Sequence, residues 1–379
     1  MTAASGSTRR LRILVYANVE RDEAGGAQAV VRSLCDHLRG QGHRVSLGWS
    51  SASGGGKCDA DEWAEQFPVR TGQLRWLHLP TAVHLLTRLL RERPDVVNIH
   101  FASPSARYFY LFAPLLGYRT VLTCHGSDVL RPLPQDAPQL AAIITGADAV
   151  TAVSHDIATK IDEELGPQRV REVTVIANGV DASFWHPASP DAPGQRPAEG
   201  RIVAIGRLEE VKGFDLLIEA LARLRVAGTP VRLSLVGDGS QRAALEQQAQ
   251  RAGVGDQIEF VGRLSREAVR ARLHAADLFV LPSRSEGTPL ALLEAMATGM
   301  ACVAADVGGV ARTAAGTAEL VPAEDPDALA AAVGRLLNDS AARGALGHQA
   351  RKRAMDFSIE HSHDTYAAVL RGVACGVER

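Results

Sequence analysis

Two glutamates around the start of a predicted helix are the clearest candidates for chemistry in this sequence. Residues 283–299 read SRSEGTPLALLEAMATG, with Glu286 in a glycine-containing loop and Glu294 further along. Thr288 is a predicted N-cap, Pro289 a first helical position and Gly299 a left-handed stop. The pattern predicts a short helix over residues 289–298, with one carboxylate before it and one inside it.

The predicted helix is apolar on most of its surface, which makes the glutamate inside it an anomaly. Leu290, Leu293 and Ala297 share one face, and most remaining positions are apolar too. An ionised Glu294 in such surroundings is costly unless a partner hydrogen-bonds it, and the hydroxyl groups of a ligand are one candidate. The alternative is a core helix after a surface loop, with Glu294 in a salt bridge.

The start of this helix is also a predicted anion site. The backbone N–H groups of Gly287, Thr288 and Leu290, together with the positive end of the helix dipole, can bind a phosphate. Glu286 lies in the loop, where it need not follow the helix register and can reach the same cavity. Carboxylates around such a site suit a ligand that carries both hydroxyl and phosphate groups.

Two cations are expected at the carboxyl end of another strand. Arg207 follows the apolar run at 202–205, and Lys212 stands just before the next predicted helix. Because ligands of α/β sheets bind at the carboxyl ends of strands, the pair indicates an anionic ligand. Either residue alone is more simply interpreted as a solvated loop cation.

Further candidates follow strands in the first half of the chain. Gly25 and Gly26 lie between a strand and a helix, where the backbone can approach phosphate or sugar, but they lack the full GxGxxG spacing. His125 and Asp128 follow another apolar run, and a lone histidine there is either structural or functional. A nucleophilic pair of His125 with Cys124 is disfavoured, because adjacent strand residues point to opposite faces.

Two other motifs receive simpler interpretations. Asn178 begins the segment NGVD, which fits a tight turn that closes the first half. Asp59 and Asp61 form a DxD, the metal–diphosphate signature of one class of transferases, but no apolar strand precedes it. We interpret this DxD as surface and expect no metal site.

Composition and charge exclude several classes of protein. A length of 379 residues predicts two or three domains, and a net charge of −2 with dispersed basic residues argues against nucleic acid. The five cysteines show no CxxC pairing, so we expect reduced thiols in a cytoplasmic enzyme, without a disulfide or structural zinc. No apolar run approaches the roughly 18 residues of a membrane span, and the run at 13–17 is too short for a signal peptide.

The elements that must position these residues alternate between strand and helix, which predicts doubly wound α/β sheets. In the first half, strands are predicted at residues 11–17, 44–47, 96–99, 120–123, 149–153 and 173–176, and helices at 27–38, 81–91, 108–116 and 139–145. In the second half, strands are predicted at 202–205, 232–236, 258–261, 278–281 and 302–304, and helices at 214–225, 243–252, 266–275, 289–298, 326–337 and 341–354.

A composition break separates the two series. Residues 186–200 (HPASPDAPGQRPAEG) are rich in Pro, Ala and Gly and predict a linker. We therefore expect an N-terminal domain over 1–185, this linker, a C-terminal domain over 201–356, and a tail over 357–379 that contains one more amphipathic helix.

Taken together, these motifs resemble those of the retaining glycosyltransferases of family 4, whose GT-B fold has two Rossmann-like α/β domains facing a cleft. The resemblance covers nearly the whole chain, and the spacing of Glu286 and Glu294 is its most specific mark. The matching segments are GGAQAV at 25–30, HGSD at 125–128, NGVD at 178–181, GRLEEVKGFD at 206–215, VGDGSQRAAL at 236–245, FVGRL at 260–264 and EGTPLALLE at 286–294.

The resemblance implies transfer of a sugar from a UDP- or GDP-sugar to a hydroxyl group, with no metal and no cofactor beyond the nucleotide-sugar substrate. It implies that Glu294 binds the ribose and Glu286 the donor sugar. Arg207, Lys212 and the amides of residues 287–290 would hold the diphosphate.

The resemblance also implies roles for residues elsewhere in the chain. Gly262, Arg263 and Leu264 would flank the base, and His125 and Gly26 would approach the sugar from the opposite domain. The tail helix would cross back onto the first domain. The remaining expected substrate contacts are Gly25, Asp128 and Asn178.

Other functions on the same fold stay open at this point. These are a sugar-nucleotide epimerase or hydrolase, and a catalytically silent nucleotide-sugar-binding subunit that partners a membrane enzyme. A glycan, lipid-linked or small-molecule acceptor would bind the first half, where the basic and apolar residues at 63–93 are also compatible with contact with an anionic membrane surface. The preferred interpretation of this segment is an ordinary helix that packs its leucines on the sheet.

Overall fold

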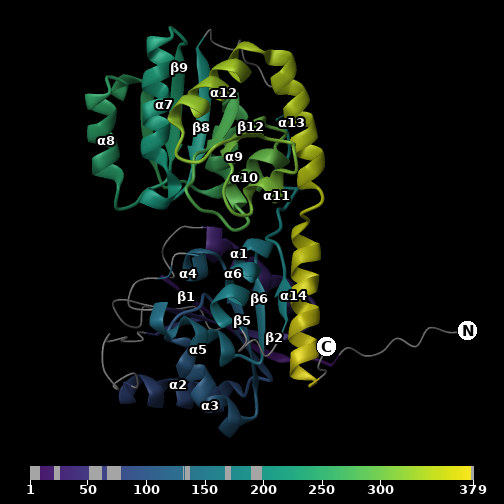
Figure 1. Cartoon of the computed structure of the whole chain (residues 1–379). Helices are drawn as coiled ribbons and strands as arrows, with labels where there is room; N and C mark the ends of the chain where they lie inside the picture. The colour runs from purple at the N-terminus through teal and green to yellow at the C-terminus, as the bar shows by residue number, and fades with distance from the viewer. Residues whose placement is uncertain are drawn as a thin grey trace, which may run out of the picture. The chain divides into compact units, whose positions relative to one another are not determined.

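The structure, a computed structural model of the chain, describes residues 9–20, 26–50, 62–65, 78–130, 132, 137–166, 172–188 and 199–376. The chain divides into two compact units (Figure 1). The first unit comprises Met1–Ile176 with His363–Arg379, and the second comprises Ala177–Ser362. The division therefore falls ahead of the composition break at residues 186–200.

A seven-stranded parallel sheet forms the first unit, in the order β3-β2-β1-β4-β5-β6-β7. The strands are β1 (Arg12–Glu20), β2 (Arg44–Ser50), β3 (Glu62–Glu65), β4 (Val96–His100), β5 (Arg119–Cys124), β6 (Ala149–Ala152) and β7 (Val173–Val175). The described helices are α1 (Gly26–Gly40), α2 (Leu79–Glu92), α3 (Ala106–Leu116), α4 (Ser127–Leu130), the 3₁₀ turn η1 (Ala137–Gln139), α5 (Leu140–Thr145) and α6 (His155–Leu165). Parallel neighbours require crossover connections, and described helices provide those from β1 to β2, from β4 to β5, from β5 to β6 and from β6 to β7.

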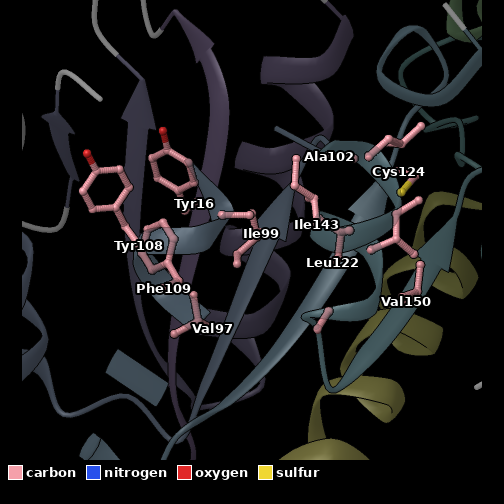
Figure 2. Packing of buried hydrophobic residues seen from close by; sticks show 14 of the residues in the cluster. Tyr16, Val97, Ile99, Ala102, Tyr108, Phe109, Leu122, Cys124, Ile143 and Val150 are labelled. Atoms are coloured by element: carbon pink, nitrogen blue, oxygen red, sulfur yellow. The ribbon is translucent and has the colours of Figure 1, made fainter. Parts of the chain in front are cut away.

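One face of this sheet is covered by an apolar cluster. Val97 and Ile99 of β4 and Leu122 of β5 are fully buried there and cluster with Phe109 of α3. Figure 2 shows them with Tyr16 and Tyr108 toward one end of the cluster, and Cys124 and Val150 toward the other. The continuous apolar runs of the sequence are thus explained by strands that are buried on both faces.

The other face is completed by the last helix of the chain. Residues of β1 and α1 cluster there with Tyr366, Ala367 and Leu370 of α14 (Ile359–Ala374). These three α14 residues are at most 1% exposed, so the helix supplies part of the first unit's core.

A six-stranded parallel sheet forms the second unit, in the order β10-β9-β8-β11-β12-β13. The strands are β8 (Gly200–Ile205), β9 (Val231–Val236), β10 (Ile258–Gly262), β11 (Leu278–Leu281), β12 (Cys302–Ala305) and β13 (Glu319–Val321). The described helices are η3 (Glu210–Lys212), α7 (Phe214–Val226), α8 (Arg242–Arg251), η4 (Gly255–Gln257), α9 (Arg266–Ala275), α10 (Leu290–Ala297), α11 (Val310–Ala314), α12 (Pro326–Asn338) and α13 (Ser340–Ala354).

Helices cover both faces of this second sheet. Apolar residues of α7, α8 and α12 cluster with one face, and those of α9, α10 and α13 cluster with the other. Figure 1 shows α7 and α12 beside each other in this unit. The doubly wound α/β class predicted from the sequence is confirmed.

The structure corrects several details of the prediction. Pro289 has extended backbone angles, φ −74° and ψ 109°, so the central helix begins at Leu290 and the predicted cap at Thr288 is wrong by one position. Gly299 does adopt the predicted left-handed conformation, with φ +76°. The sequence analysis did not predict β3, α6, α11 or β13.

Two further expectations concern the cysteines and the membrane. Cys35, Cys124 and Cys302 are buried free thiols and Cys375 is an exposed one, while Cys58 lies outside the described residues. Within the described parts of the chain, no helix is long and apolar enough to cross a bilayer.

Candidate functional site

The strand order of the second sheet brings the predicted anion-binding residues to one place. The order reverses between β8 and β11, which are neighbours in the sheet although three α-helices and the strands β9 and β10 separate them in the chain. Arg207 and Lys212 follow β8, and Glu286 and α10 follow β11. Ligands of doubly wound sheets bind at such a reversal, outside the carboxyl ends of the strands.

Glu286 is the centre of a small charged cluster in this unit. Its Oε1 accepts hydrogen bonds from Lys212 Nζ at 2.6 Å and from Ser283 Oγ at 2.7 Å. Among the described residues, no group donates to Oε2, although Glu286 is only 9% exposed. One carboxylate oxygen is therefore fixed, and the other is available to a ligand hydroxyl group. The sequence analysis did not assign a role to Ser283.

Close backbone packing holds this cluster in place. Gly213, which follows Lys212, has φ +64°, and a Cβ there would lie 2.1 Å from the Pro282 carbonyl oxygen. Gly308 has φ +48°, and a Cβ there would lie 2.1 Å from the Glu286 carbonyl oxygen. Only glycine fits at both positions, because left-handed backbone and close approach coincide.

The start of α10 has the properties of an anion site. The first N–H groups of a helix have no partner within it, and those of Leu290 and Ala291 donate to no described group. The Asn178 side-chain amide donates to the Thr288 carbonyl oxygen at 3.0 Å. Asn178 thus holds the loop before the helix, while its buried Oδ1 lacks a partner among the described residues.

Glu294 lies inside α10, mostly buried, and its carboxylate makes no hydrogen bond or salt bridge with the described residues. Burial raises the pKa of Glu294, and the positive charge of Arg266 partly offsets this rise. The resulting pKa is about 7. The alternative of a salt-bridged core glutamate therefore does not hold within the described chain. A carboxylate in this state favours a ligand that donates hydrogen bonds.

The remaining predicted residues of the second unit lie on neighbouring loops. The Arg207 side chain is exposed and has no hydrogen-bond partner among the described residues. Gly262 at the end of β10 has φ +79°, and Arg263 is exposed while Leu264 is half-buried. The Gly262 carbonyl accepts from the N–H of Gly237, at which a Cβ would lie 1.8 Å from the Gly206 carbonyl oxygen. The ends of β8, β9 and β10 are therefore packed backbone to backbone.

The first unit has its own cluster at the carboxyl ends of β4 and β5. Asp128 accepts from the N–H groups of Ala102 at 2.8 Å and Gly126 at 2.7 Å, and also from that of His125. Its carboxylate is thus occupied by backbone groups and positions the loop that carries His125. Burial lowers the pKa of His125 to about 4, so its ring is neutral at pH 7.

Two neighbours of His125 were not predicted. His100 Nδ1 lies 2.8 Å from His125 Nε2, and the Phe101 ring stacks on the His125 ring at 4.3 Å. Phe101 has φ +74°, a conformation that costs on the order of 1–3 kcal/mol in a residue other than glycine. The signal that could have indicated His100 is its position at the end of an apolar strand, which it shares with His125.

Some predicted residues cannot be assessed. Gly25, Asp59 and Asp61 lie outside the described residues. Gly26 is described, is exposed and is the first residue of α1.

Comparison with known proteins identifies the family to which the chain belongs. The model described as "Glycosyltransferase Family 4" matches residues 24–184, and "Glycosyl transferases group 1" matches 188–353. The chain is 33% identical over 294 residues to a glycogen synthase of Mycobacterium tuberculosis, an alignment that covers 74% of the chain and 70% of the relative. The chain belongs to glycosyltransferase family 4. This family 4 protein is also 32% identical, over 73% of its length and 76% of the relative, to a GDP-mannose-dependent alpha-(1-6)-phosphatidylinositol monomannoside mannosyltransferase of Mycolicibacterium smegmatis.

Solved structures agree on the fold of this family 4 glycosyltransferase. A sucrose-phosphate synthase from Thermosynechococcus elongatus has a TM-score of 0.78 at 23% identity, covering 97% of this chain and all of the other. HepE from Anabaena, solved with UDP and glucose, has a TM-score of 0.78 at 20% identity, covering 94% and 99%. The enzyme therefore has the GT-B fold.

Proposed function

We propose that this enzyme transfers a hexosyl group from a UDP- or GDP-sugar to a hydroxyl group of an acceptor, with retention of anomeric configuration and without a metal or other cofactor. The observation that carries the proposal is the cluster in the second unit. There, among the described residues, Glu286 keeps one carboxylate oxygen available beside Lys212, and Glu294 has no hydrogen-bond partner in the helix whose first N–H groups are likewise free.

Each part of the nucleotide-sugar substrate is assigned to the protein groups that match its charge and hydrogen-bonding capacity. Arg207, Lys212 and the N–H groups at the start of α10 take the diphosphate, because they are the cations and donors at the strand reversal. The unpartnered Glu294 accepts hydrogen bonds from the ribose hydroxyl groups. Glu286 Oε2 accepts from the sugar, while Lys212 holds Oε1.

The same groups stabilise the leaving diphosphate. As the sugar–phosphate bond breaks, negative charge grows on the phosphate oxygen, and two cations with helix-end amides offset it. Glu286 and Glu294 both belong to the nucleotide-binding unit, so neither is an obvious nucleophile for a covalent intermediate. We therefore favour departure and attack on one face of the sugar, with the leaving phosphate oxygen taking the acceptor's proton as the new bond forms.

The acceptor is proposed to be a glycan, a glycolipid or a small molecule bound by the first unit. Two helices of that unit carry large apolar side chains in solvent: the exposed fractions are 66% for Leu79, 54% for Val83, 52% for Leu90 and 72% for Leu115. In α2, Leu85 and Leu89 are buried in the apolar cluster of the first unit, whereas Leu79, Val83 and Leu90 are exposed, as are Arg91 and Arg93 at its end. An apolar helix face beside basic residues suits peripheral contact with an anionic membrane and hence a lipid-linked acceptor.

Product NMR tests this function. The protein is incubated with UDP- and GDP-hexoses in EDTA, with and without a panel of acceptors, and the anomeric signals of donor and product are followed. A product with the donor's anomeric configuration supports the proposal. Inversion, or activity that is lost in EDTA and restored by Mg²⁺, would contradict it. Conversion of the donor without acceptor would favour an epimerase or hydrolase, and tight donor binding without any turnover would favour a silent subunit.

A further inference from the structure

A line of hydrogen-bonded polar side chains crosses the sheet of the first unit behind His125. Asn98 and His100 lie on β4, Thr123 on β5 and Thr151 on β6, and all four have exposed fractions of 0%. They alternate along their strands with the apolar residues of Figure 2, Val97, Ile99, Leu122 and Val150, and so point to the opposite face. Four fully buried polar side chains in adjacent strands need an explanation beyond packing.

The Asn98 side-chain amide sets the direction of the line, because a hydroxyl group can both donate and accept. Thr151 Oγ1 donates to Thr123 Oγ1 at 2.9 Å, and Thr123 Oγ1 donates to Asn98 Oδ1 at 2.9 Å. Because Asn98 Oδ1 is the acceptor, its side-chain NH₂ faces His100 Nε2, at 3.0 Å. An amide NH₂ can only donate, so His100 Nε2 accepts.

The same donor-to-acceptor direction continues through the imidazole rings of His100 and His125. Burial, and then the neighbouring His125, lower the pKa of His100 well below its usual value, so this ring is neutral. A neutral ring that accepts at Nε2 carries its proton on Nδ1, which donates to His125 Nε2 at 2.8 Å. His125, also neutral at pH 7, therefore accepts at Nε2 and carries its proton on Nδ1.

We propose that Asn98 and His100 are positioning residues that hold His125 as its neutral Nδ1–H tautomer, so that it presents a hydrogen-bond donor to an oxygen of a bound substrate. The tautomer follows from the first unit alone, and only its use in transfer rests on the proposed function. No described residue hydrogen-bonds His125 Nδ1, so this N–H is available to a ligand.

Two further contacts fix the ring that carries this N–H. The Phe101 ring stacks on it with an interplanar angle of 24°, and Asp128 accepts from the backbone N–H of His125. Phe101 is held in its left-handed conformation while the next N–H, of Ala102, donates to the same carboxylate. The His125 ring is thus held by the hydrogen bond at Nε2, by the stacking of Phe101 on one face and by the hydrogen bond of its backbone N–H.

The tautomer decides what His125 can do in the reaction. An imidazole that points an N–H at the substrate cannot take a proton or attack carbon through that nitrogen. It can orient the sugar and stabilise charge that grows on the bonded oxygen. The acceptor's proton must then go elsewhere, as it does when the leaving phosphate takes it.

Histidine NMR tests the assignment directly. Long-range ¹H–¹⁵N spectra of the ¹⁵N-histidine-labelled protein at pH 7, with signals assigned through the His100→Asn and His125→Asn variants, distinguish the two tautomers. The expected result is an Nδ1–H tautomer for both rings in the wild-type protein. An Nε2–H tautomer or a protonated ring at His125 would overturn the proposal, whether or not any variant folds.

The Asn98→Asp variant tests whether Asn98 determines the tautomers of His100 and His125. The introduced carboxylate can only accept, so it draws the His100 proton to Nε2, and His125 must then donate from Nε2. We expect both tautomers to reverse and kcat for transfer to fall by about 10- to 100-fold with KM little changed. Asn338→Asp, at an exposed position, is the matched control and should change neither.

The histidine spectra and the transfer kinetics test the inference and the proposed function separately. Unchanged tautomers in Asn98→Asp, with the introduced carboxyl shown to be ionised by its ¹³C shift, would remove Asn98 from the assignment. Reversed tautomers with unchanged kcat would remove its role in transfer. If the wild-type protein transferred no sugar, the proposed function would fail while the wild-type spectrum still decided the tautomer.

Discussion

Glu294 is the residue at which burial and charge conflict most directly. Burial raises its pKa from 4.5 to about 7, and no described residue offers its carboxylate a hydrogen bond. The folded protein therefore binds this proton more tightly than the unfolded chain does. The resulting stability is fully present below about pH 4.5 and is lost as the pH rises through about 7.

Replacing the Glu294 carboxyl group with an uncharged amide should therefore stabilise the ligand-free protein at alkaline pH. We expect Glu294→Gln to raise the free energy of unfolding by roughly 1–3 kcal/mol at pH 8 and to change it little at pH 4.5, since one pKa unit corresponds to about 1.4 kcal/mol. Urea unfolding at the two pH values measures the difference. Glu163→Gln, at an exposed position, is the control, and an equal effect of Glu294→Gln at both pH values would contradict the assignment.

Arg207 and Lys212 should act on the transition state more than on folding. Replacing either by Ala should lower kcat/KM by about 100-fold, because each stabilises charge on the leaving diphosphate. Steady-state kinetics with the preferred donor measure this loss, with Lys160→Ala on the surface of the first unit as control. If both single variants kept nearly wild-type turnover, these residues would not hold the diphosphate.

At the scale of elements, the loop after β12 supports the loop that carries Glu286. The Gly309 N–H donates to the Glu286 carbonyl oxygen at 3.1 Å, and Gly308 lies directly against the same oxygen. The position of the Glu286 carboxylate thus depends on an element that contributes no functional side chain to it.

Gly308→Ala should therefore reduce activity, and Gly316→Ala should not. Both glycines have positive φ, but a Cβ at Gly308 would meet the Glu286 carbonyl at 2.1 Å whereas one at Gly316 would meet nothing within 4 Å. We expect Gly316→Ala to cost about 1 kcal/mol of stability through strain alone, and Gly308→Ala to lower kcat/KM by about tenfold or more as Glu286 shifts. Equal kinetic effects of the two variants would show that the close contact does not position Glu286.

The elements that could be predicted from the sequence are those with long, regular patterns. The continuous apolar runs of β4, β5 and β11 and the punctuated α10 were found with small boundary errors, because burial and turn residues determine them locally. β3 and β13 are short and begin with a charged residue, so their pairing depends on neighbouring strands. α6 was missed although Ser154 caps it and Ile157, Ile161 and Leu165 lie on one face, so that signal was present but not used.

At the scale of the whole molecule, each unit places its polar residues at the carboxyl ends of its strands. Motif spacing was enough to predict Glu286, Glu294, Arg207 and Lys212 as candidates. It could not predict the bond of Lys212 to Glu286, or the line from Thr151 to His125, because most of these contacts join segments that are distant in sequence. Only the folded sheets bring such residues together.

The proposed membrane contact involves the exposed residues of α2 in the first unit. If the exposed α2 residues insert at a membrane surface, the wild-type protein should float with vesicles that contain anionic lipid at low salt. The double variant Val83→Ser, Leu90→Ser should lose most of this binding, while Val226→Ser, which removes an exposed apolar side chain from the second unit, should not. Absence of any lipid-dependent shift in the wild-type protein would reject surface binding.

The division of labour between the two glutamates is the central claim, and calorimetric titration of the intact protein with UDP and GDP tests it most directly. We predict that the wild-type protein binds one of these nucleotides, and that Glu294→Gln weakens this binding by about 1–3 kcal/mol because the ribose hydroxyl groups lose their acceptor. Glu286→Gln should leave free-nucleotide binding unchanged while transfer falls. If both variants lost the nucleotide equally, or if the wild-type protein bound neither UDP nor GDP, the account of the site would be wrong.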